Sequence, residues 1–281
     1  MKYGINTLLW TAGFDASNLG LLPQFREKGF DGVEIARFSF TDFPAAEIRR
    51  ACEREGLCPL MCTALTGEQS LVSPDASIRR RTRDFLMEAI QTVAELGGDA
   101  LVGPVCSAVG YHTGKRRTED EWKNAVDGLR SLTPVLDQYG VTLAVEPLNR
   151  FETYFLNTTD DAVRLCEQVG HDRVGLLFDT FHANIEEKNV GEALVRAGKW
   201  LRHIHTCEND RGTPGSGHIE WSDVFSAIDR IGYDRWLVIE SFGSLIPEIA
   251  TAACIWRDLA PSSEAIAFDG LEFLKGKRGA R

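Results

Sequence analysis

Four short apolar segments of this 281-residue chain each contain a residue that can bind a hard divalent cation. They are residues 143–146, 176–179, 203–205 and 237–240. The candidate ligands are separated by 179 − 146 = 33, 205 − 179 = 26 and 240 − 205 = 35 residues, about one strand plus one crossover helix each time. Parallel strands connected in this way end at one rim of a barrel, so the four side chains are expected to meet there.

The candidate ligands are three carboxylates and one imidazole, namely Glu146, Asp179, His205 and Glu240. Such an oxygen-rich set suits Mn²⁺ or Mg²⁺ better than a thiolate site would, and Co²⁺ or Zn²⁺ could compete for it. One acidic residue at a strand end is more often a helix cap or an ion-pair partner. Four of these residues at barrel spacing favour a metal site, so the sequence predicts a metalloenzyme.

The whole chain alternates short apolar or β-branched segments with longer segments of helical period. Eight strands are predicted, over residues 3–9, 32–36, 59–64, 100–103, 141–146, 174–179, 201–206 and 236–241. Helices are predicted over residues 45–55, 77–96, 119–138, 160–169, 190–197 and 222–231, and glycines stand where most of them should end. No Gly-rich phosphate loop is present. This pattern predicts a single-domain α/β protein, a (β/α)8 TIM barrel over residues 1–275, with a disordered basic tail over residues 276–281.

Composition narrows the possible partners. The formal net charge of −10 argues against nucleic acid, because proteins that bind phosphate backbones usually carry a basic surface. The apolar segments are far shorter than the roughly 20 residues of a membrane span, so no membrane association is expected. Seven cysteines without a CxxC pair suggest a reducing, cytoplasmic setting.

Three further polar residues follow the candidate ligands at short distances. Glu152 lies six residues after Glu146, His182 lies three after Asp179, and Arg211 lies six after His205. Arginine can bind adjacent oxygens with its forked guanidinium group, histidine can donate to an oxygen, and a carboxylate can accept from a hydroxyl. The predicted substrate is therefore a small polyol or keto-sugar.

The ligand set also suggests a reaction. A divalent ion bound to a carbonyl oxygen and a neighbouring hydroxyl stabilises a developing enediolate by several kcal/mol. A tuned carboxylate can then remove the adjacent carbon-bound hydrogen. Glu146 and Glu240 come from different strands and could approach one carbon from opposite faces, so that removal by one and return by the other inverts the centre. Return at the neighbouring carbon would instead give an isomerase.

The segments around the candidate ligands resemble those of a known family. The segments carrying the resemblance are Val145-Glu146-Pro147-Leu148-Asn149-Arg150-Phe151-Glu152, Phe178-Asp179-Thr180-Phe181-His182-Ala183-Asn184-Ile185-Glu186-Glu187, Ile204-His205, Arg211-Gly212 and Ile239-Glu240-Ser241-Phe242. They are similar to the ketose 3-epimerases, the group of D-tagatose, D-psicose (D-allulose) and L-ribulose 3-epimerases in the xylose-isomerase-like barrel superfamily. The likeness runs from about residue 3 to about residue 275 and is most specific from about 141 to 243.

The resemblance implies a (β/α)8 barrel that binds Mn²⁺ or Co²⁺ and no organic cofactor, and that forms a homodimer or homotetramer. Carried over by motif, Glu146, Asp179, His205 and Glu240 would be the ligands, with Glu146 and Glu240 also the acid/base pair. The substrate would be held near C1 to C3 by Glu152, His182 and Arg211. The family often has aromatic residues where this chain has Ile5-Asn6-Thr7. The resemblance therefore implies the reaction more strongly than it implies which sugar is the substrate.

The leading hypothesis is a metal-dependent epimerase that inverts C3 of a free ketose. The alternatives on the same metal site are a sugar or hydroxypyruvate-type isomerase, a 3-keto-sugar enzyme, and a lyase related to inosose dehydratases. An abasic-site endonuclease would need a basic groove, and a silent sugar-binding subunit should have lost a ligand. His203 shares strand parity with His205 and is either a hydrogen-bonded interior residue or a neighbour of the metal site.

Overall fold

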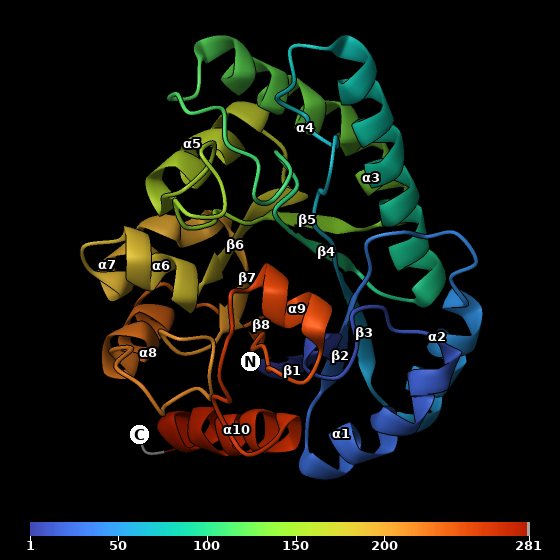
Figure 1. Cartoon of the computed structure of the whole chain (residues 1–281), viewed down its shortest axis with the longest axis vertical. Coiled ribbons are helices and arrows are strands. Elements are labelled where there is room, and N and C mark those ends of the chain that lie inside the picture. Colours follow the sequence, from blue (N-terminus) through green and yellow to red (C-terminus); the bar gives the residue numbers. More distant parts are fainter. Residues whose placement is uncertain (280–281) are drawn as a thin grey trace.

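Eight parallel strands form a closed barrel in which each strand pairs with the next and the last pairs with the first (Figure 1). The computed structural model describes residues 1–279. The strands are β1 (Lys2–Asn6), β2 (Gly32–Ala36), β3 (Cys58–Cys62), β4 (Ala100–Gly103), β5 (Thr142–Val145), β6 (Val174–Asp179), β7 (Leu201–Thr206) and β8 (Trp236–Ile239). The predicted (β/α)8 barrel is confirmed.

Helices surround the strands, and one short helix lies over the barrel in the view of Figure 1. The surrounding helices are α1 (Leu22–Lys28), α2 (Ala45–Glu55), α3 (Ala76–Leu96), α4 (Glu119–Tyr139), α5 (Thr159–Val169), α6 (Thr180–Glu186), α7 (Val190–Ala197), α8 (Trp221–Arg230) and α10 (Ser263–Gly279). The helix over the barrel is α9 (Pro247–Ala252), and three 3-10 turns, η1 (Thr7–Leu9), η2 (Ala16–Leu21) and η3 (Gly198–Trp200), complete the described elements. The sequence did not predict α1, α6, α9 or α10.

The long helices begin and end where their capping residues require. Thr118 and Glu121 form a reciprocal capping box at the start of α4, which satisfies backbone N–H groups that have no partner inside the helix. Gly140 ends the same helix in the left-handed conformation that glycine adopts without strain. These local signals explain why the predicted helices agree with the observed ones to within one residue at most ends.

The barrel interior is apolar at its base and polar toward the C-terminal rim. Strand register places Leu60 beside Glu34 and Val238 beside His205, so these side chains share the inner face. At the base, Trp236 fills the interior against Gly32, where a Cβ atom would lie only 2.6 Å from the indole. The absence of a side chain at Gly32 therefore allows the Trp236 indole to fill the base of the barrel, below the polar site.

Several strands are shorter than predicted. β1 ends at Asn6 because the Asn6 side chain accepts a hydrogen bond from Leu8 N and turns the chain into η1. β5 and β8 end at Val145 and Ile239, one residue before Glu146 and Glu240. The two glutamates therefore stand in loops at the rim.

The C-terminal segment also differs from the expectation. We expected a disordered tail from residue 276, but α10 continues through Gly279, and residues 280–281 lie outside the described residues. Within the described chain, no helix combines the length and the apolar character needed to cross a membrane.

Candidate metal centre and active site

The four predicted ligands come together at the C-terminal rim. Glu146 follows β5, Asp179 ends β6, His205 lies in β7 and Glu240 follows β8. Each offers a ligand atom, and these atoms lie within 4.8 Å of one another in a buried cluster. The regular spacing in the sequence therefore corresponds to four side chains that meet at the ends of four consecutive strands.

The cluster has the properties of a site for a hard divalent cation. Glu146 Oε1 and His205 Nδ1 are buried and have no hydrogen-bond partner within the protein. His205 Nδ1 lies 3.2 Å from Glu240 Oε2 and 3.9 Å from Asp179 Oδ2. Buried polar atoms without partners are rare and costly, and a cation among three carboxylates and an imidazole would satisfy them. The residues present thus fit a metal ion.

The two glutamates of the cluster have different electrostatic surroundings. Burial, followed by the neighbouring Glu240 charge, raises the pKa of Glu146 well above its ordinary value. Burial also raises the pKa of Glu240, but His205 and then Arg211 outweigh it and leave that pKa below its ordinary value. Two carboxyl groups whose pKa values are pushed apart are suited to acid and base roles.

Asp179 holds its orientation by capping α6. Its Oδ1 atom accepts from the backbone N–H of Phe181 at 2.6 Å and of His182 at 3.4 Å. The second oxygen, Oδ2, faces the cluster and accepts from Arg211 Nη1 at 2.9 Å. The N-cap role therefore fixes the ligand and also places His182 in the first helical turn.

The three predicted substrate contacts lie beside the ligands. His182 Nδ1 accepts from the backbone N–H of Asn149 at 3.0 Å. Nε2 lies 3.6 Å from Glu146 Oε1 and 2.9 Å from Arg211 Nη2, a guanidinium nitrogen that only donates. Burial, then Arg211 and His205, hold the pKa of His182 well below its ordinary value. His182 and Arg211 therefore contact each other beside Glu146, and both line the cavity.

Glu152 and Arg211 are held by their own loops. Asn149 Nδ2 donates to Glu152 Oε1 at 2.8 Å. Because the backbone of Asn149 also contacts His182, this residue connects Glu152 with His182. Arg211 has a φ of 69°, an unusual left-handed conformation for a residue with a side chain, and its guanidinium carbon lies 4.1 Å from the Phe181 ring centroid. A strained backbone at a polar site is consistent with a functional position.

A cavity of about 340 Å³ opens onto this cluster. Glu146, Glu152, His182, Arg211 and Glu240 line its polar part. The remaining lining is mostly apolar and includes Leu8, Phe38, Val109, Leu148, Phe242 and Ile249. The last of these belongs to α9, the helix that lies over the barrel in Figure 1, so α9 contributes to the cavity wall. The cavity suits a small molecule with oxygens at one end.

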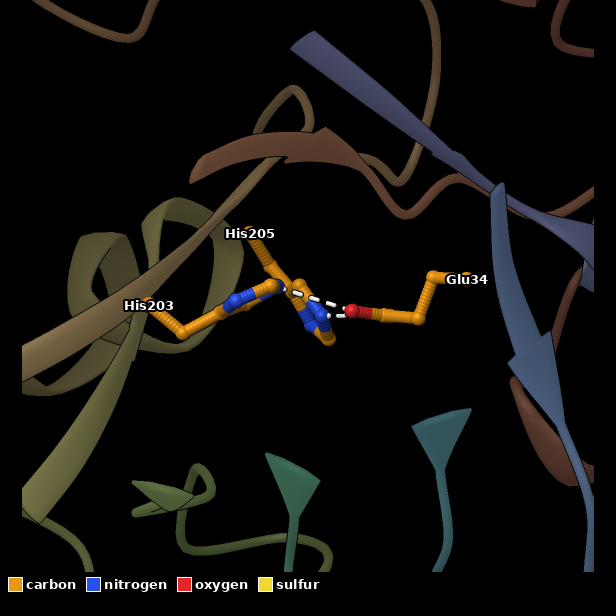
Figure 2. A group of neighbouring side chains, drawn as sticks. All are labelled: Glu34, His203 and His205. Atoms are coloured by element: carbon orange, nitrogen blue, oxygen red, sulfur yellow. Dashed lines mark hydrogen bonds and ion pairs between the residues drawn. The ribbon is translucent and has the colours of Figure 1, made fainter. Parts of the chain in front are cut away.

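Two buried carboxylates near the site, Glu34 and Glu208, were not predicted from the sequence. Glu34 on β2 is fully buried and contacts both histidines of β7 (Figure 2). Glu208 is also fully buried and accepts from Trp221 Nε1 at 2.6 Å and from Gly215 N at 2.7 Å, which orders the loop that carries Arg211. Glu34 could have been found, because an acidic residue inside an otherwise apolar strand is rarely without a partner.

The fold and its acidic rim match a known class of barrels. The family described as "Xylose isomerase-like TIM barrel" matches residues 22–277. A probable ketose 3-epimerase from Synechocystis sp. is 36% identical over 275 residues, which cover 98% of this chain and 96% of the relative. A D-psicose 3-epimerase from Ruminiclostridium cellulolyticum is 30% identical over 274 residues, covering 96% of this chain and 93% of the relative.

Solved structures agree with these relatives. A D-allulose 3-epimerase from Methylomonas sp., in complex with D-allulose, superposes with a TM-score of 0.93 at 26% identity and covers 99% of this chain and 97% of that one. A D-psicose 3-epimerase from Clostridium cellulolyticum H10, with D-tagatose, gives a TM-score of 0.91 at 29% identity, covering 98% and 99%. The chain therefore belongs to the xylose isomerase-like TIM barrel family and, within it, to the ketose 3-epimerases. The resemblance drawn from its motifs is confirmed.

Proposed function

We propose that the protein is a metal-dependent epimerase that inverts C3 of a free ketose of the D-tagatose, D-psicose, D-fructose or L-ribulose type. The observation that carries this proposal is that Glu146 and Glu240, which follow two different strands, meet in one buried cluster and both line a cavity of about 340 Å³. Relatives named for ketose 3-epimerisation along almost the full chain support the same reaction.

Glu146, Asp179, His205 and Glu240 would hold the ion, and Mn²⁺ is the proposed metal, with Co²⁺ or Mg²⁺ as substitutes. When bound, such an ion stabilises the negative charge that develops on the carbonyl oxygen during proton removal. The proposal requires no organic cofactor. Its support is the chemistry of the ligand set, three carboxylates and one imidazole, with two atoms that lack other partners.

The glutamates would carry the proton. One carboxylate removes the hydrogen at C3 from one face of the sugar, and the other carboxyl group returns a proton to the opposite face. Removal and return on opposite faces invert the centre without net oxidation. This division of roles is supported by their surroundings, which raise the pKa of Glu146 and lower that of Glu240.

Three other side chains would orient the substrate. The His182 ring and the guanidinium of Arg211 donate to oxygens near C1 to C3, and Glu152 accepts from a hydroxyl. Asn149 supports this arrangement because it contacts both His182 and Glu152. The rest of the cavity wall is mostly apolar and offers few hydrogen-bond partners to sugar hydroxyls far from C3. This supports activity on more than one ketose.

The proposed setting is a reducing cytoplasm, supported by seven free cysteines, five of them buried. We also propose a homodimer or homotetramer. Its support is the exposure of four large apolar side chains among the described residues, Tyr111, Phe151, Leu245 and Trp256.

Product analysis tests the proposed function. Mn²⁺-loaded protein is incubated with D-fructose, D-tagatose, D-psicose, L-ribulose and D-xylulose, and the products are separated by chromatography. The expected result is the C3 epimer of at least one ketose. Formation of an aldose instead would establish the isomerase alternative, and loss of water would establish the lyase.

A further inference from the structure

Glu34 reaches across the barrel interior from β2 to β7 (Figure 2). Its Oε1 atom lies 2.8 Å from His205 Nε2, in hydrogen-bonding geometry, and its Oε2 atom lies 2.8 Å from His203 Nε2. All three side chains are at most 1% exposed. An unpaired buried carboxylate would be strongly destabilising, so the two imidazoles are the partners that allow Glu34 to be buried.

The contact determines which nitrogen of His205 can face a metal. Glu34 Oε1 also accepts from Asn6 Nδ2, an amide nitrogen that only donates. The same oxygen therefore acts as an acceptor toward His205, whose Nε2 carries the proton of their 2.8 Å contact. The other nitrogen, Nδ1, is the one that faces Asp179 and Glu240.

Asn6 connects this arrangement to a second ligand. Its Nδ2 atom donates to Glu34 Oε1 at 2.8 Å and to Glu240 Oε1 at 3.2 Å. Its Oδ1 atom accepts from Leu8 N at the start of η1, which fixes the amide orientation. Glu34 is thus connected to His205 directly and to Glu240 through one side chain.

We propose that Glu34 is a positioning residue of the metal centre, which keeps the Nε2–H tautomer of His205 and so presents Nδ1 to the ion. Through Asn6 it also restrains Glu240. The inference rests on the metal site of the proposed function. Carboxylates that accept from a ligating histidine are a general way to set its tautomer and basicity, and their loss typically weakens metal binding 10- to 100-fold.

A different use of these residues is a second metal site, since Glu34, His203 and His205 also have ligand atoms within 4.8 Å of one another. The hydrogen bond from His205 Nε2 to Glu34 argues against it. An imidazole that binds one ion through Nδ1 would have to lose its second proton to bind another through Nε2. Positioning requires no such loss.

The test is the Glu34→Gln variant, which keeps the size of the side chain but has one acceptor oxygen in place of two. Glu187→Gln is the matched control, because it alters a carboxylate whose side chain is only 7% exposed and whose partners, Thr159 N and Arg196, lie outside the candidate site. Mn²⁺ affinity is measured by titration calorimetry. We expect Glu34→Gln to weaken binding 10- to 100-fold and Glu187→Gln to change it less than about threefold.

A second readout reports the tautomer itself. In ¹⁵N-histidine-labelled protein loaded with Zn²⁺ as a diamagnetic probe, His205 should show a protonated Nε2 and a metal-bound Nδ1, and Glu34→Gln should broaden or shift the Nε2 signal. If Glu34→Gln does not fold, as judged by circular dichroism, Asn6→Ala takes its place, and we expect it to weaken Mn²⁺ binding by about three- to tenfold.

The outcomes separate this inference from the proposed function. A folded Glu34→Gln protein, or Asn6→Ala in its place, that binds Mn²⁺ as tightly as the wild type would overturn the inference, even if the wild type epimerises ketoses. Two bound ions per wild-type chain would also overturn it in favour of the second site. A wild type that binds Mn²⁺ through Nδ1, loses affinity in Glu34→Gln and leaves every ketose unchanged would support the inference and contradict the proposed function.

Discussion

His205 Nδ1 lies 3.2 Å from Glu240 Oε2, across the edge where β7 and β8 pair. Burial lowers the pKa of His205, but Glu240 and Glu34 outweigh it and raise that pKa well above its ordinary value. The two glutamates therefore favour the protonated form of the ring that the proposed function assigns to the metal. An ion that binds at this nitrogen must release a proton from it.

Metal removal should abolish activity and lower stability. Dialysis against a chelator leaves three buried carboxylates without their cation, and an ion that binds only the folded state at 100 times its Kd adds about 2.7 kcal/mol to the free energy of unfolding. Epimerase assays and thermal unfolding with and without Mn²⁺ measure both effects. Full activity in protein shown by mass spectrometry to be metal-free would contradict the metal-dependent mechanism.

Glu146→Gln and Glu240→Gln should each lower kcat by about 100-fold or more, since each removes a group assigned to proton transfer and to metal binding. Assays at saturating Mn²⁺ limit the contribution of weakened metal binding. Glu152→Gln is the comparison, because its assigned role is to accept from a hydroxyl, and its main effect should be on KM. Equal losses in all three variants would argue against the assignment of the acid/base pair.

Arg211→Lys should raise KM by about tenfold, which corresponds to about 1.4 kcal/mol, because an ammonium group cannot replace the forked guanidinium beside Asp179 and His182. Arg150→Lys provides the control. Arg150 also pairs with a carboxylate, Glu186, but its side chain is 62% exposed and should contribute little. Steady-state kinetics of both variants measure the difference, and an unchanged KM in Arg211→Lys would remove this residue from the proposed site.

Gly103→Ala should destabilise the barrel by more than about 2 kcal/mol. Gly103 ends β4 with a φ of 128°, and an added Cβ atom would lie 2.0 Å from the carbonyl oxygen of Thr63. Gly110→Ala is the matched control, since Gly110 has a φ of 79° but open space around it, and should cost about 1 kcal/mol. Urea unfolding of both variants gives the comparison, and equal costs would mean that the contact with Thr63 relaxes freely.

The barrel was predictable from sequence because its signals are local. Caps such as Asp75 and Thr118, and glycines such as Gly97 and Gly140, mark the ends of α3 and α4 in the chain itself. The short helices α6 and α9 carry no such period, since each has fewer than eight residues. α6 begins at Asp179, which caps the helix with Oδ1, while its other oxygen accepts from Arg211 in the cluster of candidate ligands.

The four candidate ligands could be predicted because each lies at or near the C-terminal end of a strand, at intervals of 26 to 35 residues. For Glu34 the sequence indicates that a buried acidic residue needs a partner but not which one, because His205 is 171 residues away in the chain and no periodic pattern connects β2 with β7. The closed barrel brings these strands to face each other across the interior, which only the three-dimensional arrangement shows (Figure 2). The supporting contacts of a site are therefore harder to predict than its ligands.

In the proposed mechanism, one of the two glutamates removes the hydrogen at C3 of a ketose and the other returns a proton. NMR of the ketose panel incubated with Mn²⁺-loaded protein in D₂O, beside Glu240→Gln, follows this transfer. We expect deuterium at C3 together with the C3 epimer in the wild type, and neither in the variant. Bound Mn²⁺ with no exchange at C3 of any ketose would contradict this mechanism.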